Sequence, residues 1–298
     1  MKVTAGGGFT ARINRAHPPL GSFVEAGVGR LHYLRAGPKE ALPLVLLHGA
    51  SGNLRDWTSS VFAALAKDWN VIAVDRPGYG HSSLLPDQSW LINPQTHALR
   101  AMMAELGYAR YAVFGHSYGV AVALDWAINY PDEVAGLVTM SGAMVSWQGA
   151  LGWRYRLGGI APIGRLMGEA APLIATEALL KKELAEVFDP DPVPATYLEE
   201  GGIALALKPR TFALNLRAMD QLHWQTVQAI PRVPQITCPV EVLHGRADAI
   251  IPYDPESGPI AALAPKAHTV ILDQVGHMPH HTQPESVLAS TNRLSERV

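Results

Sequence analysis

The chain has 298 residues, of which 48% are hydrophobic and 17% charged, and its formal net charge is -2. This length accommodates one large domain or two small ones with a sizeable core, and the composition excludes a disordered chain. The near balance of 24 basic and 26 acidic residues, without a long basic run, argues against nucleic-acid binding and against an anionic-membrane surface.

The single cysteine, Cys238, rules out an internal disulfide framework and is compatible with a reducing compartment. The N-terminus lacks the apolar region of a secretory signal, and no run of apolar residues is long enough to span a membrane. We therefore expect a cytoplasmic protein without a membrane span. Residues 1–19, with a glycine triplet and two consecutive prolines, are expected to form a loose N-terminal tail.

Short apolar runs that end at glycine or at a polar residue predict the strands of a sheet. The first two, at residues 23–25 and 30–34, flank a glycine-containing turn and indicate an antiparallel hairpin. The later runs are mostly apolar, which is typical of a parallel sheet covered on both faces. They lie at residues 44–47, 71–74, 111–114, 137–140, 240–243 and 269–272.

Helical patterns alternate with these runs. Asn93, as N-cap, and Pro94 predict the start of one helix, and Gly107 its end. A second helix is expected from Tyr118 to Tyr130. This alternation predicts an α/β fold with a doubly wound, mostly parallel eight-stranded sheet that is flanked by helices.

The segment 144–230 departs from this alternation, because its helix fragments are separated by prolines and carry many large apolar side chains. A helical insertion of this length between strands 6 and 7 predicts a cap over an α/β core formed by residues 20–143 and 231–298. We expect most of its aromatic residues to hold the cap on the sheet. The candidates for substrate contact are Trp147, Trp153, Met167, Met219 and Trp224.

The most specific motif is Gly-His-Ser-Tyr-Gly at residues 115–119, which follows a strand and precedes a helix. This is the context of a nucleophile elbow, where flanking glycines permit a tight turn and the serine stands at a helix N-terminus. Free N–H groups and the helix dipole favour developing negative charge there. Ser117 is therefore the predicted nucleophile.

A serine hydroxyl needs a general base, and the base needs an orienting carboxylate. His277, after a glycine that follows the last strand, is the candidate base. Asp248, after the seventh strand, is the candidate carboxylate, with Asp254 and Asp273 as weaker rivals. The order serine, acid, histidine matches that of the α/β-hydrolases.

His280 and His281 follow the candidate base at a spacing that also occurs in metal sites. Because no cysteine or paired carboxylate joins them in the sequence, we expect no metal. We expect these two histidines to be structural or exposed to solvent.

Acyl transfer also needs donors for an oxyanion. The expected donors are the backbone N–H of Tyr118, the residue after the nucleophile, and that of Ala50, in the loop after the first long parallel strand. In that loop, His48 is expected to brace the backbone rather than to react.

These motifs resemble the α/β-hydrolase fold family, in its capped, carboxylesterase-like branch. The resemblance covers nearly the whole chain after about residue 21. One departure is Val120, where many members have a second glycine. The motifs that carry the resemblance are His48-Gly49 and the segments 75–82, 115–119, 245–248 and 276–277.

The resemblance implies a serine hydrolase that cleaves small to medium carboxylic esters through an acyl-enzyme, without a cofactor. Other members of the fold hydrolyse C–C bonds or lactones or are haloperoxidase-like, and these alternatives stay open. Ser117 argues against dehalogenases and epoxide hydrolases, which use aspartate. The non-enzyme alternative is an apolar-ligand binding protein. The substrate and the oligomeric state, including a homodimer, stay open.

Overall fold

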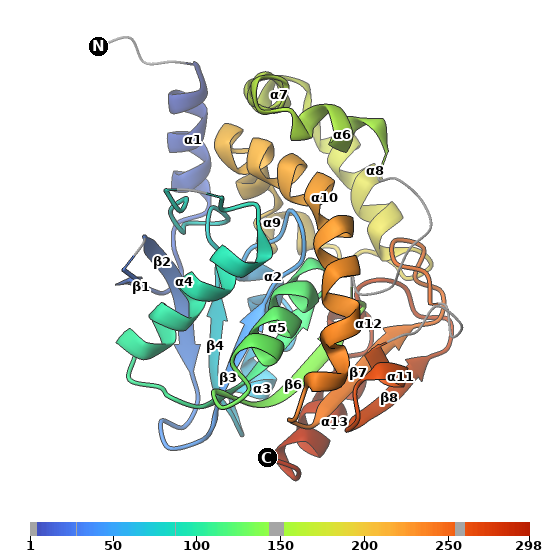
Figure 1. The fold of residues 1–298 in the computed structure, drawn as a ribbon. Coiled ribbons are helices and arrows are strands. Elements are labelled where there is room, and N and C mark those ends of the chain that lie inside the picture. The colour runs from blue at the N-terminus through green and yellow to red at the C-terminus, as the bar shows by residue number, and fades with distance from the viewer. Residues whose placement is uncertain (1–4, 28, 87, 143–151, 254–259) are drawn as a thin grey trace.

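The computed structural model describes residues 5–27, 29–86, 88–142, 152–253 and 260–298 (Figure 1). Within them, eight strands form one sheet in the order β1-β2-β4-β3-β5-β6-β7-β8. The strands are β1 (Ser22–Glu25), β2 (Arg30–Ala36), β3 (Pro43–Leu47), β4 (Asn70–Val74), β5 (Tyr111–His116), β6 (Val134–Met140), β7 (Val240–Gly245) and β8 (Ala267–Leu272). The strand β2 pairs antiparallel with β1 and β4, and all other pairs are parallel. The predicted mostly parallel eight-stranded sheet is confirmed.

The register of the parallel strands brings their carboxyl ends to one edge. Leu47 at the end of β3 pairs with Gly115 of β5, and His116 pairs with Met140 at the end of β6. The loops after β3, β5, β7 and β8 therefore leave the sheet on the same side, where α/β folds place their sites.

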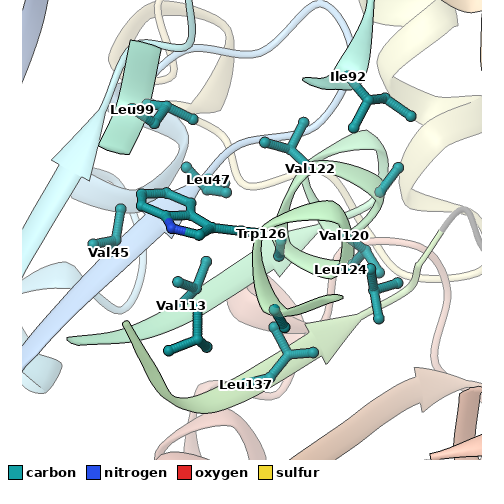
Figure 2. Packing of buried hydrophobic residues seen from close by; sticks show 14 of the residues in the cluster. Val45, Leu47, Ile92, Leu99, Val113, Val120, Val122, Leu124, Trp126 and Leu137 are labelled. Carbon is teal, nitrogen blue, oxygen red and sulfur yellow. The ribbon is translucent and has the colours of Figure 1, made fainter. Parts of the chain in front are cut away.

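Alternate residues of each central strand enter different cores, because successive side chains point to opposite faces. Val45 and Val113 belong to a cluster with α4 (Ile92–Glu105) and α5 (Tyr118–Asn129). Figure 2 shows Trp126 of α5 beside Val45, Leu47 and Val113. Residues such as Leu46 and Phe114 pack on the other face with residues of α2 (Arg55–Thr58), α3 (Phe62–Leu65) and α13 (Pro284–Ser295).

Between β6 and β7 the described chain is helical. It comprises α6 (Trp153–Gly159), α7 (Ala161–Ile174), α8 (Glu177–Phe188), α9 (Tyr197–Glu200), the 3-10 helix η1 (Ile203–Leu207), α10 (Pro209–Ala229) and η2 (Ile230–Gln235). In Figure 1, α6 and α7 lie beyond the upper end of the sheet and α10 runs down beside α5. Two further short helices are α11 (Ile260–Leu263) and α12 (Pro279–Thr282).

Two local expectations were wrong. The N-terminal segment is not a loose tail, because Ala5–Ala16 form the helix α1, with Ile13 buried. The chain after α1 is also held, since Arg55 donates from Nη2 to the carbonyl of Pro18. The helix α4 is capped by Leu91 instead of Asn93, and the N–H of Ile92 donates to the Gln225 side chain of α10 at 2.7 Å. Both features depend on tertiary contacts that local patterns do not encode.

In the described ranges, no helix combines the length and the apolar character that a membrane crossing requires.

Candidate active site

Ser117 occupies the turn between β5 and α5 with φ 52° and ψ −119°, a backbone conformation that is rare for residues with a side chain. Its N–H donates to the carbonyl of Met140 at 3.0 Å. A Cβ at Gly115 would lie 2.6 Å from the backbone of Gly119, and a Cβ at Gly119 would lie 2.3 Å from the carbonyl oxygen of Leu47. The two glycines of the motif are therefore sterically required for the strained turn.

Ser117, His277 and Asp248 form one chain of hydrogen bonds. His277 Nδ1 lies 2.8 Å from Asp248 Oδ2, and His277 Nε2 lies 3.0 Å from Ser117 Oγ. Because an ionised carboxylate only accepts, Nδ1 carries the proton and the Nε2 lone pair faces the serine hydroxyl. The other oxygen of Asp248 accepts the N–H groups of Ile250 and Ile251 at 2.9 and 2.8 Å, which fixes the carboxylate.

Two further buried histidines support these groups through backbone carbonyls. His116 Nε2 donates to the carbonyl of His277 at 3.0 Å, and His244 Nε2 donates to that of Ile251 at 2.9 Å. Burial lowers the pKa of His244 and lowers the pKa of His116 well below its ordinary value. Both imidazoles are therefore neutral donors that hold the segments carrying His277 and Asp248.

The rival carboxylates do not reach the same position. The side chain of Asp273 is 77% exposed and pairs with Arg246 Nε at 2.6 Å. Asp254 lies outside the described residues.

The loop after β3 packs directly against the elbow. A Cβ at Gly49 would lie 3.1 Å from Ser117 Cβ, so the loop backbone borders the serine. Ser51 N donates to Asn215 Oδ1 at 2.9 Å and Gly52 N donates to the carbonyl of Gly49.

The two expected oxyanion donors are free of backbone acceptors among the described residues. Within the described part of the chain, the N–H of Ala50 has no acceptor. The N–H of Tyr118 belongs to the first turn of α5, where amides have no intrahelical acceptor.

His48 and Arg76 hold the backbone of the loop after β3 through hydrogen bonds. Arg76 donates from Nε to the carbonyl of His48 and from Nη2 to that of Gly49, both at 2.9 Å. His48 donates from Nδ1 to the carbonyl of Gly49 and accepts the N–H of Arg76 on Nε2. Burial, followed by the charge of Arg76, lowers the pKa of His48 to about 3. A neutral bracing role, as expected from the sequence, agrees with these contacts.

The helical insertion contacts three of the loops at the carboxyl edge. Asn215 of α10 accepts from Tyr79 at 3.2 Å and donates to Ser51 Oγ at 2.9 Å. Thr211 donates to the carbonyl of Gly78, and the side chain of Asp191 accepts the N–H of Gly276, next to His277. Sequence reasoning did not identify Asn215, because a single polar residue within a helix has no motif around it.

The five residues proposed to contact substrate differ in their surroundings. Trp153 and Trp224 are 73% and 63% exposed, whereas Met167 is partly buried. Met219 is also partly buried and packs against the main core cluster. Trp147 lies outside the described residues.

Next to the hydrogen-bond chain of Ser117, His277 and Asp248, the buried carboxylate of Asp56 contacts two histidines that follow His277 in the sequence. Asp56 Oδ1 accepts from Tyr197 at 2.8 Å and from His281 Nε2 at 3.0 Å. His280 Nε2 lies 3.1 Å from Asp56 Oδ2. Burial opposes ionisation of Asp56, but the two histidines outweigh it and hold its pKa well below the ordinary value. His280 and His281 are therefore structural groups, and neither side chain faces solvent.

The eight-stranded, mostly parallel sheet and the sequence that forms it match a known family. The model of the alpha/beta hydrolase family matches residues 44–290. The chain belongs to the alpha/beta hydrolase family. Membership accounts for the mostly parallel eight-stranded sheet, and it leaves the substrate open.

Proteins that are similar to this chain differ in the reactions that their names state. The chain is 29% identical over 276 residues to the dihydrolipoyllysine-residue acetyltransferase component of the acetoin cleaving system of Pseudomonas putida, covering 92% of this chain and 69% of the relative. It is 25% identical over 233 residues to 2-hydroxy-6-oxo-6-phenylhexa-2,4-dienoate hydrolase of Comamonas testosteroni, covering 75% and 77%. The enol-lactonase of Burkholderia xenovorans LB400 superposes with a TM-score of 0.71 at 21% identity, over 92% of this chain and 100% of that one.

Proposed function

We propose that this chain is a serine hydrolase that cleaves small to medium carboxylic esters. Ser117 is the nucleophile, His277 the general base and Asp248 the carboxylate that orients the imidazole. The observation that carries the proposal is the unbroken hydrogen-bond chain from Asp248 Oδ2 through His277 to Ser117 Oγ, with the serine in a strained turn at a helix N-terminus.

In the acylation step, Ser117 Oγ attacks the ester carbonyl carbon while His277 Nε2 takes the hydroxyl proton. The bond from the carbonyl carbon to the alcohol oxygen then breaks, and His277 returns the proton to the leaving alcohol. Asp248 accepts the Nδ1–H throughout, which keeps the imidazole in the required tautomer and stabilises the imidazolium. Water attacks the acyl-enzyme in the same way and releases the carboxylic acid and free Ser117.

The negative charge that develops on the carbonyl oxygen needs donors that are already in place. We assign this role to the N–H groups of Ala50 and Tyr118. Support comes from the loop of Ala50, which borders Ser117 and is fixed by Arg76 and Asn215. Removing one such donor raises the activation barrier by about 2.7–4 kcal/mol in other enzymes.

We further propose that residues 144–230 form a cap that roofs the site. Contacts of the insertion with the loops after β3, β4 and β8 support this role. Among the proposed wall residues, Met219 and Met167 are the partly buried ones, and Trp147, Trp153 and Trp224 complete the set. An apolar roof would favour substrates by about 0.8 kcal/mol per buried CH₂ and would limit their length.

A second candidate is the hydrolysis of a C–C bond, favoured by the 25% identity to a relative named as a 2-hydroxy-6-oxo-6-phenylhexa-2,4-dienoate hydrolase. A lactone is a third substrate type, because it is a cyclic ester open to the same attack on its carbonyl carbon.

The test is a substrate panel assayed with the wild-type chain and with Ser117→Ala. The panel contains p-nitrophenyl esters of increasing acyl length, a lactone, an epoxide and a vinylogous diketone. We expect the short and medium esters to have the highest kcat/KM, and Ser117→Ala to lose all turnover. Preferred cleavage of the diketone would favour the proposal of a C–C hydrolase over that of an ester hydrolase. Binding of the esters without any turnover would support the ligand-binding alternative.

A further inference from the structure

Asp56, His116 and His280 form a compact cluster behind the proposed triad. They come from α2, from the end of β5 and from α12, and their exposed fractions are 4%, 3% and 0%. One potential ligand atom from each residue lies within 4.8 Å of the other two. The proposed mechanism uses none of these three side chains.

The hydrogen bonds of His116 leave one ring nitrogen with a lone pair that faces a carboxylate. Its Nε2 donates to the carbonyl of His277, so Nε2 carries the proton and Nδ1 is unprotonated. Nδ1 is buried without a hydrogen-bond partner and lies 3.8 Å from Asp56 Oδ2. Two acceptors that face each other in a dry interior repel unless a positive group lies between them.

The hydrogen bonds of Asp56 with residues outside the cluster also leave its Oδ2 for the two imidazoles. Tyr197 and His281 both donate to Oδ1, which leaves Oδ2 for His116 and His280. Neither ring nitrogen of His280 has a hydrogen bond, although Nε2 lies 3.1 Å from Oδ2. Among the residues that the structure describes, no lysine or arginine pairs with Asp56.

We propose that Asp56 Oδ2, His116 Nδ1 and His280 Nε2 bind a divalent transition-metal ion of the zinc class. Two imidazole nitrogens and one carboxylate oxygen are ligands that Zn²⁺ prefers, and water completes four-coordination. Zinc bonds of about 2.0–2.1 Å place tetrahedral ligand atoms about 3.3–3.4 Å apart. The separations of 3.1 and 3.8 Å bracket this value, and the ion would draw the imidazoles together.

This site revises the expectation of no metal, which considered His277, His280 and His281. The structure turns His277 toward Ser117 and Asp248, and it supplies Asp56 and His116 from distant parts of the chain. His281 then acts on the carboxylate instead of on the ion, as groups around metal ligands commonly do.

The ion would hold together the elements that position the triad. His116 immediately precedes Ser117, and His280 lies on α12, directly after the segment that carries His277. The ion does not touch the reacting atoms, so its role is structural and independent of which carbonyl compound the enzyme cleaves.

The test measures metal content in the full-length chain after removal of any histidine tag. The protein is treated with a chelator, equilibrated with Zn²⁺ or Co²⁺ and desalted, and bound metal is quantified by mass spectrometry. We expect about one ion per chain, a melting temperature that rises with Zn²⁺ concentration, and a visible Co²⁺ spectrum of four- or five-coordinate type.

Variants locate the ion. His116→Asn and His280→Gln should each weaken Zn²⁺ binding by more than about 100-fold, and His281→Gln by about 10–100-fold. The control His97→Gln, which changes an exposed histidine outside the cluster, should keep the wild-type stoichiometry. Circular dichroism identifies variants that do not fold, and Asp56→Asn is interpreted only if it folds. Substoichiometric zinc in the wild type, or undiminished binding by folded His116→Asn and His280→Gln, would overturn the proposal.

Discussion

The elbow between β5 and α5 and the helical insertion between β6 and β7 are built in opposite ways. Around Ser117, glycines are required because an added Cβ would lie as close as 2.3 Å to backbone, and the strands β5 and β6 are buried along their whole length. The insertion instead exposes large apolar side chains, among them Trp153, Leu173 and Trp224. It also joins the core through buried apolar residues such as Ala218 and Leu222, and through polar contacts such as those of Asn215.

We relate this difference to two tasks of the proposed enzyme, the alignment of the reacting groups and the selection of the substrate. A rigid, dry elbow keeps the reacting groups aligned before substrate arrives, which is what transition-state stabilisation requires. The exposed apolar side chains of the insertion are the ones that tolerate substitution, so they are the part where substrate selectivity can change without loss of the fold. Variants in the core should therefore affect chemistry by orders of magnitude, and variants in the insertion should change substrate preference by small factors.

The largest effect is expected for Ser117→Ala, which removes the proposed nucleophile without adding bulk. Loss of kcat on a p-nitrophenyl ester should be on the order of 10⁵–10⁶-fold, as for nucleophile removal in other serine hydrolases. The matched control is Ser141→Ala, since Ser141 is also buried with positive φ at the end of a neighbouring strand. It should keep kcat within a few-fold. Equal losses in both variants would mean that the elbow has no special role.

Asp248→Asn should reduce kcat on the order of 10⁴-fold, because an amide does not hold His277 in the tautomer that accepts the serine proton. Asp273→Asn is the control, because that carboxylate is exposed and pairs with Arg246. Steady-state kinetics on one ester compares the two variants. A loss of less than tenfold for Asp248→Asn would point to a different acid.

Acid should destabilise the core, where the buried neutral histidines are located. The pKa of His48 is lowered to about 3 in the folded chain, below the value of 6.5 for an unfolded one, so between these values the unfolded state binds more protons. Stability therefore falls as the pH decreases, by about 2 kcal/mol for His48 alone between pH 6.5 and 4.5. Urea unfolding across this range should show a shallower pH dependence for a folded His48→Gln variant. Equal slopes would contradict a neutral His48.

Asn215→Ala tests the link between the two regions. It removes hydrogen bonds to Ser51 and Tyr79, so the loop that carries the Ala50 N–H loses support from α10. We expect kcat to fall about tenfold, or roughly 1.4 kcal/mol, with little change in KM. Thr211→Val also removes a bond between α10 and the core, but to Gly78, and should lower the melting temperature while preserving kcat. Identical kinetics of the two variants would contradict the role of Asn215 in supporting the loop that carries the Ala50 N–H.

The smallest effect is expected in the insertion itself. Met219→Ala and Trp224→Ala should shift the preferred acyl length toward longer or bulkier esters, by about fourfold in kcat/KM per CH₂ accommodated. Melting temperatures measured on the same variants distinguish a wall from a packing residue. If only the melting temperature changes, these side chains merely hold the insertion in place.

The features that could be predicted from the sequence are those that depend on residues close together in the chain. Mostly apolar runs predicted the central strands, because parallel strands covered on both faces need no polar side. The G-x-S-x-G pattern predicted the strained turn, because its two glycines stand where a Cβ would collide with backbone. His277 and Asp248 were predicted from their positions after strands, and the structure brings His277 to Ser117 and Asp248 to His277.

The parts that were missed depend on contacts between distant segments. A glycine triplet suggested a loose start, yet α1 forms and buries Ile13. Asp56 and Asn215 have no motif around them, and their hydrogen bonds to Tyr197 and Ser51 join positions more than 130 residues apart in the chain. The spacing of His280 and His281 was visible, but the carboxylate that both approach was not.

The most direct test of the account is to trap the covalent intermediate. The full-length chain is treated with a serine-directed phosphonate, and intact mass and peptide mapping locate the adduct. We predict one adduct per chain on Ser117, present in Ser141→Ala and absent in Ser117→Ala. Labelling of another residue at the same rate in Ser117→Ala, or ester turnover that the phosphonate leaves unchanged, would contradict the central claim that Ser117 carries the acyl group.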